Sequence, residues 1–214
     1  MSCRVAVLIS GSGSNLQALL DAAAQVDAPF SVSTVVSNKA DAYGLTRAEQ
    51  AGVPTSVVNH RNYSSRETFD HALIEEIDKC KPDLVVLAGF MRILTPDFVR
   101  HYSGRLINIH PSLLPKYQGL HTHKRALEAG DKEHGVTVHF VTEELDGGPP
   151  IVQAIVPVKE GDTPELLAKR VQIQEHIIYP MAVTWFAQQR LQMADDRVRF
   201  DGELLPHHGV QVSA

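Results

Sequence analysis

The sequence contains three polar side chains whose types and spacing suit one chemical step. Asn108 and His110 lie two residues apart directly after the apolar pair Leu106-Ile107, and Asp146 lies in the glycine-rich segment 145–148. Residues two apart in a β-strand point to the same face of the sheet. An amide donor and a protonated imidazole can stabilise an oxyanion, while an imidazole and a carboxylate can transfer protons. These are the groups that acyl transfer to an amine requires.

A second candidate site lies near the N-terminus, in the segment Ser10-Gly11-Ser12-Gly13-Ser14-Asn15. It lies between an expected strand and an expected helix, where backbone N–H groups and the helix dipole attract an anion. A dinucleotide fingerprint would need a third glycine at Leu16 and an acid in place of Ser37-Asn38-Lys39. The Lys-Ser/Thr pair of an ATP-binding loop is also missing. The segment therefore predicts a site for a single phosphate on a small substrate.

The elements that must position these residues alternate between strand and helix. The expected strands are apolar runs at residues 5–9, 33–37, 55–58, 84–88 and 106–109. The expected helices are amphipathic stretches at 14–24, at 41–51, and from 64 or 65 to 80. This rhythm predicts an α/β protein with a Rossmann-like, mostly parallel sheet and helices on both faces.

The rhythm changes after residue 130, where strands 136–141 and 151–156 flank a turn-rich loop and predict an antiparallel pair added to the sheet. A long C-terminal helix should run from Thr163-Pro164 to about Arg190, kinked or split by Pro180. A hairpin is expected at Asp201-Gly202, and the tail after Pro206 is expected to be loose. We expect one domain over 1–214, with a phosphate-binding half of about 1–105 and a catalytic half of about 106–205.

The composition excludes several classes of protein. The 214 residues are 43% hydrophobic, enough for one large core, and the net charge of -5 argues against a nucleic-acid-binding surface. Cys3 and Cys80 are the two cysteines and form no CxxC pair, which fits a reduced, cytoplasmic compartment. The longest apolar run, 84–90, is far shorter than the roughly 20 residues that span a bilayer.

Eleven histidines raise the question of a metal site. His121 and His123 are two apart, and His134 and His139 are close in the sequence, but no HExxH or Cys/His cluster accompanies them. We therefore expect surface or loop histidines and no metal.

Five segments together resemble the folate-dependent formyltransferases, and among them the phosphoribosylglycinamide formyltransferases of purine biosynthesis. Asn-x-His-Pro-Ser-Leu-Leu-Pro at 108–115 with Leu-Asp-Gly-Gly at 145–148 is specific for folate-dependent formyl transfer. The resemblance extends over residues 4 to about 205 and also involves segments 10–16, 88–94 and 119–123. One position departs from the pattern, because Gln118 stands where relatives often carry Pro.

This resemblance implies transfer of the formyl group of 10-formyltetrahydrofolate, a co-substrate, to the amine of 5′-phosphoribosylglycinamide, without a metal. It implies that Asn108, His110 and Asp146 are catalytic, with Asp146 favouring the charged imidazole. The implied substrate-binding residues are Gly13, Ser14, Asn15, Gln172 and Glu175. The implied folate-binding residues are Arg66, Met91, Arg92, Ile93, Leu94, Asn108, Thr142, Glu143, Glu144, Leu145 and Asp146.

The implied partners are therefore two small molecules, with no nucleic acid and no membrane, and the protein is expected to be a monomer or homodimer. Two other functions stay open at this point. A 10-formyltetrahydrofolate hydrolase would use the same three residues with water as the nucleophile and would not need the phosphate loop. A non-catalytic nucleotide-binding module would bind a nucleotide without transferring a formyl group.

Overall fold

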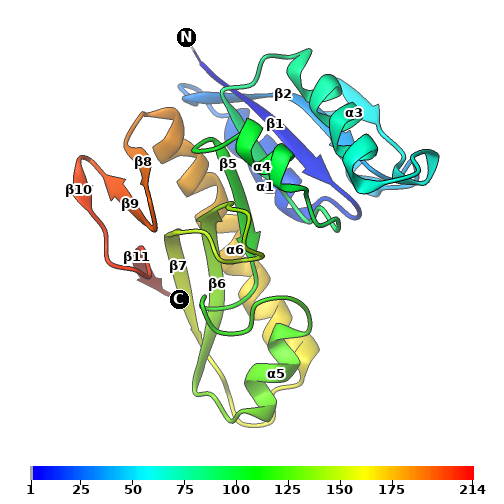
Figure 1. The fold of residues 1–214 in the computed structure, drawn as a ribbon. Coiled ribbons are helices and arrows are strands. Elements are labelled where there is room, and N and C mark those ends of the chain that lie inside the picture. Colours follow the sequence, from blue (N-terminus) through cyan, green and yellow to red (C-terminus); the bar gives the residue numbers. More distant parts are fainter. Residues whose placement is uncertain (1) are drawn as a thin grey trace. The chain divides into compact units, whose positions relative to one another are not determined.

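A computed structural model describes residues 2–214 of the chain (Figure 1). The chain comprises two compact units, residues 1–107 and 108–214, and the division falls inside strand β5 (Leu106–His110). An eight-stranded sheet has the order β11-β7-β6-β5-β4-β1-β2-β3, and a three-stranded sheet has the order β10-β9-β8. The mostly parallel α/β fold is confirmed, while the single domain with two functional halves stays a prediction.

The first unit is built from parallel strands joined by helical crossovers. Strand β1 pairs in parallel with β2 and β4, and β2 pairs in parallel with β3. Because such crossovers are right-handed, α1 and α2 cover one face of these strands and α3 and α4 cover the other. The strands are β1 (Cys3–Ile9), β2 (Phe30–Ser37), β3 (Thr55–Val57) and β4 (Leu84–Leu87). The helices are α1 (Ser14–Ala23), α2 (Tyr43–Gln50), η1 (His60–Asn62), α3 (Arg66–Asp78) and α4 (Pro96–His101).

Side-chain caps determine where two of these helices begin. The Ser65 hydroxyl accepts from the Thr68 N–H and Thr68 reciprocates, forming a capping box at the start of α3. Thr95 caps α4, and Pro96 occupies its first position. Helix α4 has only six residues, too few to produce the periodic pattern from which the longer helices were predicted.

The second unit combines β-hairpins with one long helix. Strands β6 and β7 pair antiparallel as predicted, and helix α6 packs against both of them. Strands β9 and β10 form the predicted hairpin at Asp201-Gly202, and β8 adds a third strand that was not predicted. The remaining strands are β6 (Glu133–Phe140), β7 (Pro150–Pro157), β8 (Leu191–Ala194), β9 (Arg197–Phe200), β10 (Glu203–Leu204) and β11 (Val210–Ser213). The helices are α5 (Thr122–Glu128) and α6 (Pro164–Ala187).

Two expectations for the C-terminal part are wrong, a split of the long helix at Pro180 and a loose tail, while a kink at Pro180 stays a prediction. Helix α6 continues through Pro180 without a split, because Ile178, Tyr179 and Ala182 around it are completely buried and their packing outweighs the roughly 3 kcal/mol cost of an internal proline. The tail after Pro206 is also ordered. Residues 210–213 pair in parallel with β7 and satisfy the hydrogen-bonding groups along that strand.

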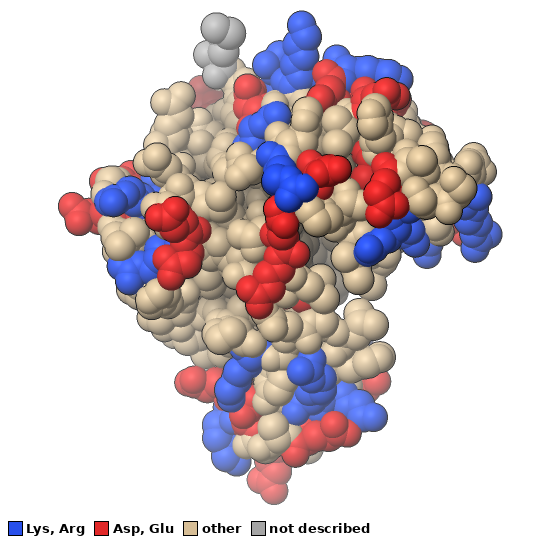
Figure 2. Space-filling model, viewed as in Figure 1, with Lys and Arg blue, Asp and Glu red and all other residues tan. Residues whose placement is uncertain are grey.

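The surface carries charges of both signs. On the face drawn in Figure 2, acidic and basic side chains are interspersed, with no broad area of one sign among the residues described. Within residues 2–214, no helix has the length and apolar character needed to cross a membrane.

The position of β11 leads to a stability prediction at Gly209. Its φ is +72°, and a Cβ there would lie 2.5 Å from the Ile151 carbonyl oxygen. We expect Gly209→Ala to combine backbone strain of about 1 kcal/mol with displacement of β11. Gly202→Ala is the matched control, because φ is +86° there and nothing lies within 4 Å of the added Cβ. Urea unfolding should show the larger loss of unfolding free energy for Gly209→Ala, with faster hydrogen exchange at residues 210–213. Equal losses in the two variants would contradict the predicted clash with the Ile151 carbonyl.

Candidate active site

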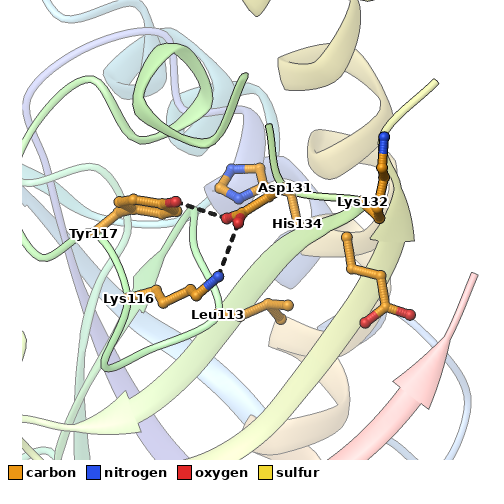
Figure 3. Close-up of a pocket in the computed structure, with 7 residues that line it drawn as sticks. Leu113, Lys116, Tyr117, Asp131, Lys132 and His134 are labelled. Atoms are coloured by element: carbon orange, nitrogen blue, oxygen red, sulfur yellow. Dashed lines mark hydrogen bonds and ion pairs between the residues drawn. The ribbon is translucent and has the colours of Figure 1, made fainter. Parts of the chain in front are cut away.

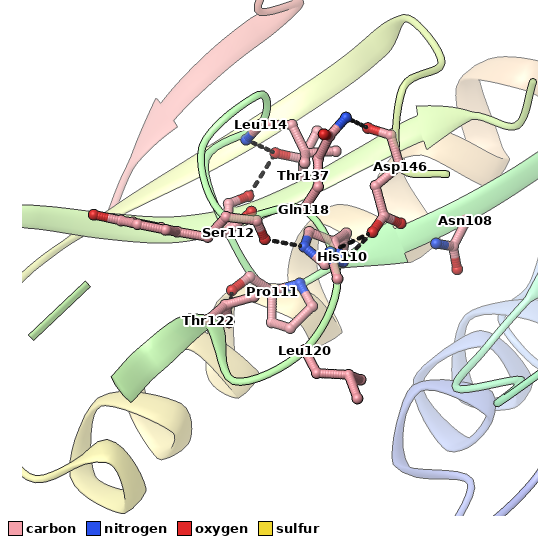
Figure 4. Close-up of polar contacts among 12 residues, drawn as sticks. Asn108, His110, Pro111, Ser112, Leu114, Gln118, Leu120, Thr122, Thr137 and Asp146 are labelled. Atoms are coloured by element: carbon pink, nitrogen blue, oxygen red, sulfur yellow. Dashed lines mark hydrogen bonds and ion pairs between the residues drawn. The ribbon is translucent and has the colours of Figure 1, made fainter. Parts of the chain in front are cut away.

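The structure brings His110 and Asp146 together in the second unit. His110 ends strand β5 and Asp146 lies in the loop between β6 and β7, yet His110 Nδ1 is 3.5 Å from Asp146 Oδ2. Both side chains are less than one-tenth exposed. In Figure 4 the imidazole and the carboxylate point toward one another, and the amide of Asn108 points toward them from β5. The spacing in the sequence therefore predicted this cluster.

The backbone of one short segment holds both members of the pair. The Tyr117 carbonyl oxygen lies 2.8 Å from His110 Nε2, and the Gly119 N–H donates to Asp146 Oδ2 over 2.9 Å. A carbonyl oxygen only accepts hydrogen bonds, so His110 Nε2 carries a proton whether the ring is neutral or charged. Nδ1 is consequently the ring nitrogen that faces Asp146.

Asn108 is oriented by His139, which the sequence pattern did not place in the site. Its Nδ2 lies 3.3 Å from His139 Nε2, and His139 Nδ1 lies 2.9 Å from the Phe140 carbonyl oxygen. Burial lowers the pKa of His139 to about 4, so the ring is neutral at pH 7, with its proton on Nδ1. Nε2 then accepts from one N–H of Asn108, and the second N–H of the amide is left to donate elsewhere.

A buried polar network holds the loop that follows β5. Thr137 Oγ1 donates to the Ser112 carbonyl over 2.7 Å and accepts from the Leu114 N–H over 3.1 Å. Gln153 Nε2 donates to the Leu114 carbonyl over 2.8 Å. These groups satisfy irregular backbone that has no strand partner, and so fix the start of the loop that reaches Tyr117.

The phosphate loop in the first unit depends on a close approach of two glycines. Gly13 precedes α1 with φ of +73°, and a Cβ there would lie 2.6 Å from the Gly44 Cα at the start of α2. The Gly44 N–H donates to the Gly11 carbonyl, and Arg47 Nε donates to the Ser12 carbonyl over 2.8 Å. Gly44 and Arg47 were not predicted, because they are distant in sequence from the glycine-rich motif they support.

The predicted folate segment 91–94 is held by buried side chains at both ends. The Met91 N–H donates to Ser10 Oγ over 2.8 Å, and the Thr95 N–H donates to Asp70 Oδ2 over 2.6 Å. Burial raises the pKa of Asp70, although the hydrogen bonds from Thr95 and the charges of Arg66 and Arg92 oppose this shift. Ser10 also begins the phosphate loop, so one hydroxyl joins the two predicted binding segments of this unit.

The other predicted binding residues lie on separate elements. Arg66 is the exposed first residue of α3, and Met91 and Ile93 are largely exposed in the loop between β4 and α4. Residues 142–146 lie in the loop between β6 and β7. Gln172 and Glu175 lie one turn apart on α6. Gln118, the position that departs from the family pattern, donates from Nε2 to the Asp146 carbonyl over 3.4 Å.

The expectation of surface or loop histidines is wrong for His134 and His139, which are buried within strand β6. His134 Nε2 lies 3.1 Å from His123 Nδ1, and His139 is bonded to Asn108. Apolar neighbours along a strand indicate burial, but they do not reveal the polar partners that make a buried histidine acceptable. Within residues 2–214, no three His, Cys, Asp or Glu side chains are grouped as metal ligands.

Comparison with known proteins identifies the class. The formyl transferase family model matches residues 3–183, so the chain belongs to the formyl transferase family.

Two curated relatives match the chain over nearly its whole length. The chain is 58% identical over 205 residues to the phosphoribosylglycinamide formyltransferase of Escherichia coli, covering 96% of this chain and 97% of that protein. It is 49% identical over 206 residues to the protein of that name from Haemophilus influenzae, with the same coverages. The solved phosphoribosylglycinamide formyltransferase of Coxiella burnetii superposes with a TM-score of 0.95 at 52% identity, covering 99% of each chain. These relatives place the chain among the phosphoribosylglycinamide formyltransferases.

The two buried histidines lead to a pH prediction. Burial lowers the pKa of His134 and of His139 to about 4. In the unfolded chain both rings take up a proton near pH 6.5, so between pH 6.5 and 4 the unfolded state binds more protons. The free energy of unfolding should therefore fall as the pH drops through this window, by an amount of order 3 kcal/mol per histidine.

Urea unfolding at pH 7 and pH 4.5 tests this prediction. The difference between the two pH values should be smaller in His134→Gln than in the wild type. His71→Gln is the control, because His71 lies on α3 with its side chain 76% exposed. An unchanged pH difference in His134→Gln would show that His134 does not take part in the effect.

Proposed function

We propose that this protein transfers the formyl group of 10-formyltetrahydrofolate to the amine of 5′-phosphoribosylglycinamide, giving formylglycinamide ribonucleotide and tetrahydrofolate. The observation that carries the proposal is the buried His110–Asp146 pair, in which Nε2 is bonded to a backbone carbonyl and Nδ1 faces the carboxylate. The relatives named above support the choice of substrates. Both reactants are small molecules, and a cytoplasmic location as a monomer or homodimer is the corresponding expectation.

The reaction begins when the amine lone pair attacks the formyl carbon and the carbonyl π electrons move to oxygen. Asn108 donates its second amide N–H to this oxyanion, and protonated His110 donates from Nδ1. The amine then loses a proton, directly or through water, to the carboxylate of Asp146. The oxyanion electrons then re-form the carbonyl as the bond between the formyl carbon and the folate nitrogen breaks, and that nitrogen takes the proton from Asp146, directly or through water, so no covalent enzyme intermediate is needed.

Asp146 favours the charged imidazole because an opposite charge 3.5 Å away stabilises it in a site with little access to water. The imidazolium stabilises the oxyanion, and Asp146 in turn stabilises the imidazolium. Such preorganised charge costs little rearrangement during the reaction, which is why it accelerates the chemical step.

In this proposal the substrate phosphate binds at Gly13, Ser14 and Asn15. Gly13 precedes α1 with a φ of +73° and makes no side-chain cap hydrogen bond. A site that binds an anion through backbone N–H groups requires such a helix start. Gln172 and Glu175 bind the ribose. The proposed folate contacts are Arg66 and the segment 91–94 in the first unit, where Met91 and Ile93 are exposed, and the loop 142–146 in the second unit, where Leu145 is exposed.

The direct test follows loss of the formyl group from 10-formyltetrahydrofolate with and without the acceptor. We expect consumption to require 5′-phosphoribosylglycinamide. Equal consumption of 10-formyltetrahydrofolate without the acceptor would identify a hydrolase. No consumption in the presence of the acceptor would favour a non-catalytic nucleotide-binding module.

Asp146→Asn tests the acid of the pair. The amide keeps the shape and can still accept from the Gly119 N–H, but it cannot carry the charge or take up a proton. We expect kcat to fall by roughly 10²–10⁴-fold, as is typical when acid–base catalysis is removed, while circular dichroism shows an intact fold. His110→Asn should cause a comparable loss. The fold-loss of kcat in the double variant should be smaller than the product of the two single losses, because the residues act as a unit. Near-wild-type turnover in Asp146→Asn would remove this residue from the mechanism.

Gly13→Ala tests the phosphate site. The added Cβ would meet the Gly44 backbone at 2.6 Å, so we expect the KM for the acceptor to rise at least about 10-fold while the folate KM changes little. The matched control is Gly52→Ala, which has a similar φ of +71° and nothing within 4 Å of the new Cβ. An acceptor KM equal in both variants would place the phosphate elsewhere.

A further inference from the structure

One acidic side chain outside the proposed catalytic trio is joined to it by a short chain of contacts. Asp131 lies between α5 and β6, and its side chain is 15% exposed. Its Oδ2 accepts from the Tyr117 hydroxyl over 2.6 Å, and its Oδ1 accepts from Lys116 Nζ over 2.9 Å. Figure 3 shows both bonds at the wall of a cavity of about 420 Å³.

Tyr117 connects this cavity wall to the catalytic pair. Its side chain reaches Asp131, while its backbone carbonyl, on the other side of the residue, accepts from His110 Nε2 over 2.8 Å. Two residues later, the Gly119 N–H binds Asp146 Oδ2. The segment 117–119 therefore touches both His110 and Asp146, and a shift in this segment would move both contacts.

The conformation of Tyr117 requires something to hold it. Its φ is +57°, in the left-handed region that costs a residue with a Cβ roughly 1 kcal/mol or more. The ring lines a cavity and is only partly buried, so close packing does not fix its position. The remaining ring contacts are two cations, Arg125 at 5.1 Å and Lys116 Nζ at 5.8 Å from its centre, and the His134 ring, whose centre lies 6.3 Å away. The hydrogen bond to Asp131 is the directional one among these contacts, and the bond lowers the pKa of Asp131, as expected when the charged carboxylate accepts it.

We propose that Asp131 is a positioning residue for the formyl transfer: through the Tyr117 hydroxyl it holds the 117–119 backbone that sets the tautomer of His110 and the place of Asp146. This role rests on the proposed function of the His110–Asp146 pair. In this proposal Asp131 contacts neither substrate.

The test uses Tyr117→Phe, Asp131→Ala and the double variant in the full-length protein. Tyr117→Phe keeps the ring and removes only the hydroxyl. The control is Lys116→Met, which removes the ion pair with Asp131 and leaves the Tyr117–Asp131 bond in place. Urea unfolding of each variant checks that the fold persists.

We expect Tyr117→Phe and Asp131→Ala each to lower kcat by roughly 10-fold or more, because small misplacements of catalytic groups are costly, while both KM values stay within about twofold. The double variant should lose no more than the worse single variant, because both changes remove the same bond. Lys116→Met should keep kcat within about twofold of the wild type.

Nitrogen-15 NMR of the His110 ring gives a readout that a purely structural role would not move. The wild type should show the proton on Nε2 in the neutral ring, and Tyr117→Phe should show a mixture of the two tautomers. The spectrum needs no substrate, so it is independent of the proposed reaction. An unchanged tautomer and kcat in folded Tyr117→Phe would overturn the positioning role, whereas a wild type inactive with the acceptor would overturn the proposed function alone.

Discussion

The hydrogen bond between His110 Nε2 and the Tyr117 carbonyl is the interaction on which the candidate active site depends. A nearly buried imidazole must satisfy both ring nitrogens, and this bond assigns a permanent proton to one of them. The other nitrogen then faces Asp146. His110 is fixed by strand β5, whereas Tyr117 lies in the loop that follows β5. Other contacts must therefore hold this loop in place.

Backbone groups position the main residues at both predicted sites. Near His110 the ligands are the Tyr117 carbonyl and the Gly119 N–H, and at the phosphate loop the Gly13–Gly44 approach shapes the start of α1. Backbone can turn toward a ligand only where the chain leaves regular structure, which explains the positive φ values at Tyr117, Gly119 and Gly13. The strain is acceptable because adjoining strands and helices fix the ends of each loop.

Sequence patterns predicted the parts of this protein that depend on local periodicity. The two-residue spacing of Asn108 and His110 on a strand was sufficient to place both near one site, and the glycines around Asp146 marked its loop. The short helix α4 and the strand β11 were missed because six or four residues carry little periodic signal, and because β11 is ordered only by pairing with β7.

His139, Asp70 and Asp131 were missed for a different reason. Each acts through a partner that is 25 to 31 residues away in the sequence or is reached through another residue's backbone. A single sequence gives the type of each residue but not its partner in the fold. A polar residue in an apolar strand therefore looks the same whether it binds a substrate, positions another residue or is merely buried. Only the folded chain distinguishes these cases.

Part of the core of the second unit is polar, since Ser112, Thr137 and Gln153 are buried, as are His110 and His139. Apolar residues of similar size would cost less desolvation, but they would leave the loop carbonyls of Ser112 and Leu114 without donors. A fully bonded polar network in a low-dielectric setting is rigid, because shifting any member breaks bonds that water cannot replace. Rigidity of this kind suits a site in which one imidazole proton must face one carboxylate, and it explains why the loop after β5 is tied to β6 and β7 before it reaches Tyr117.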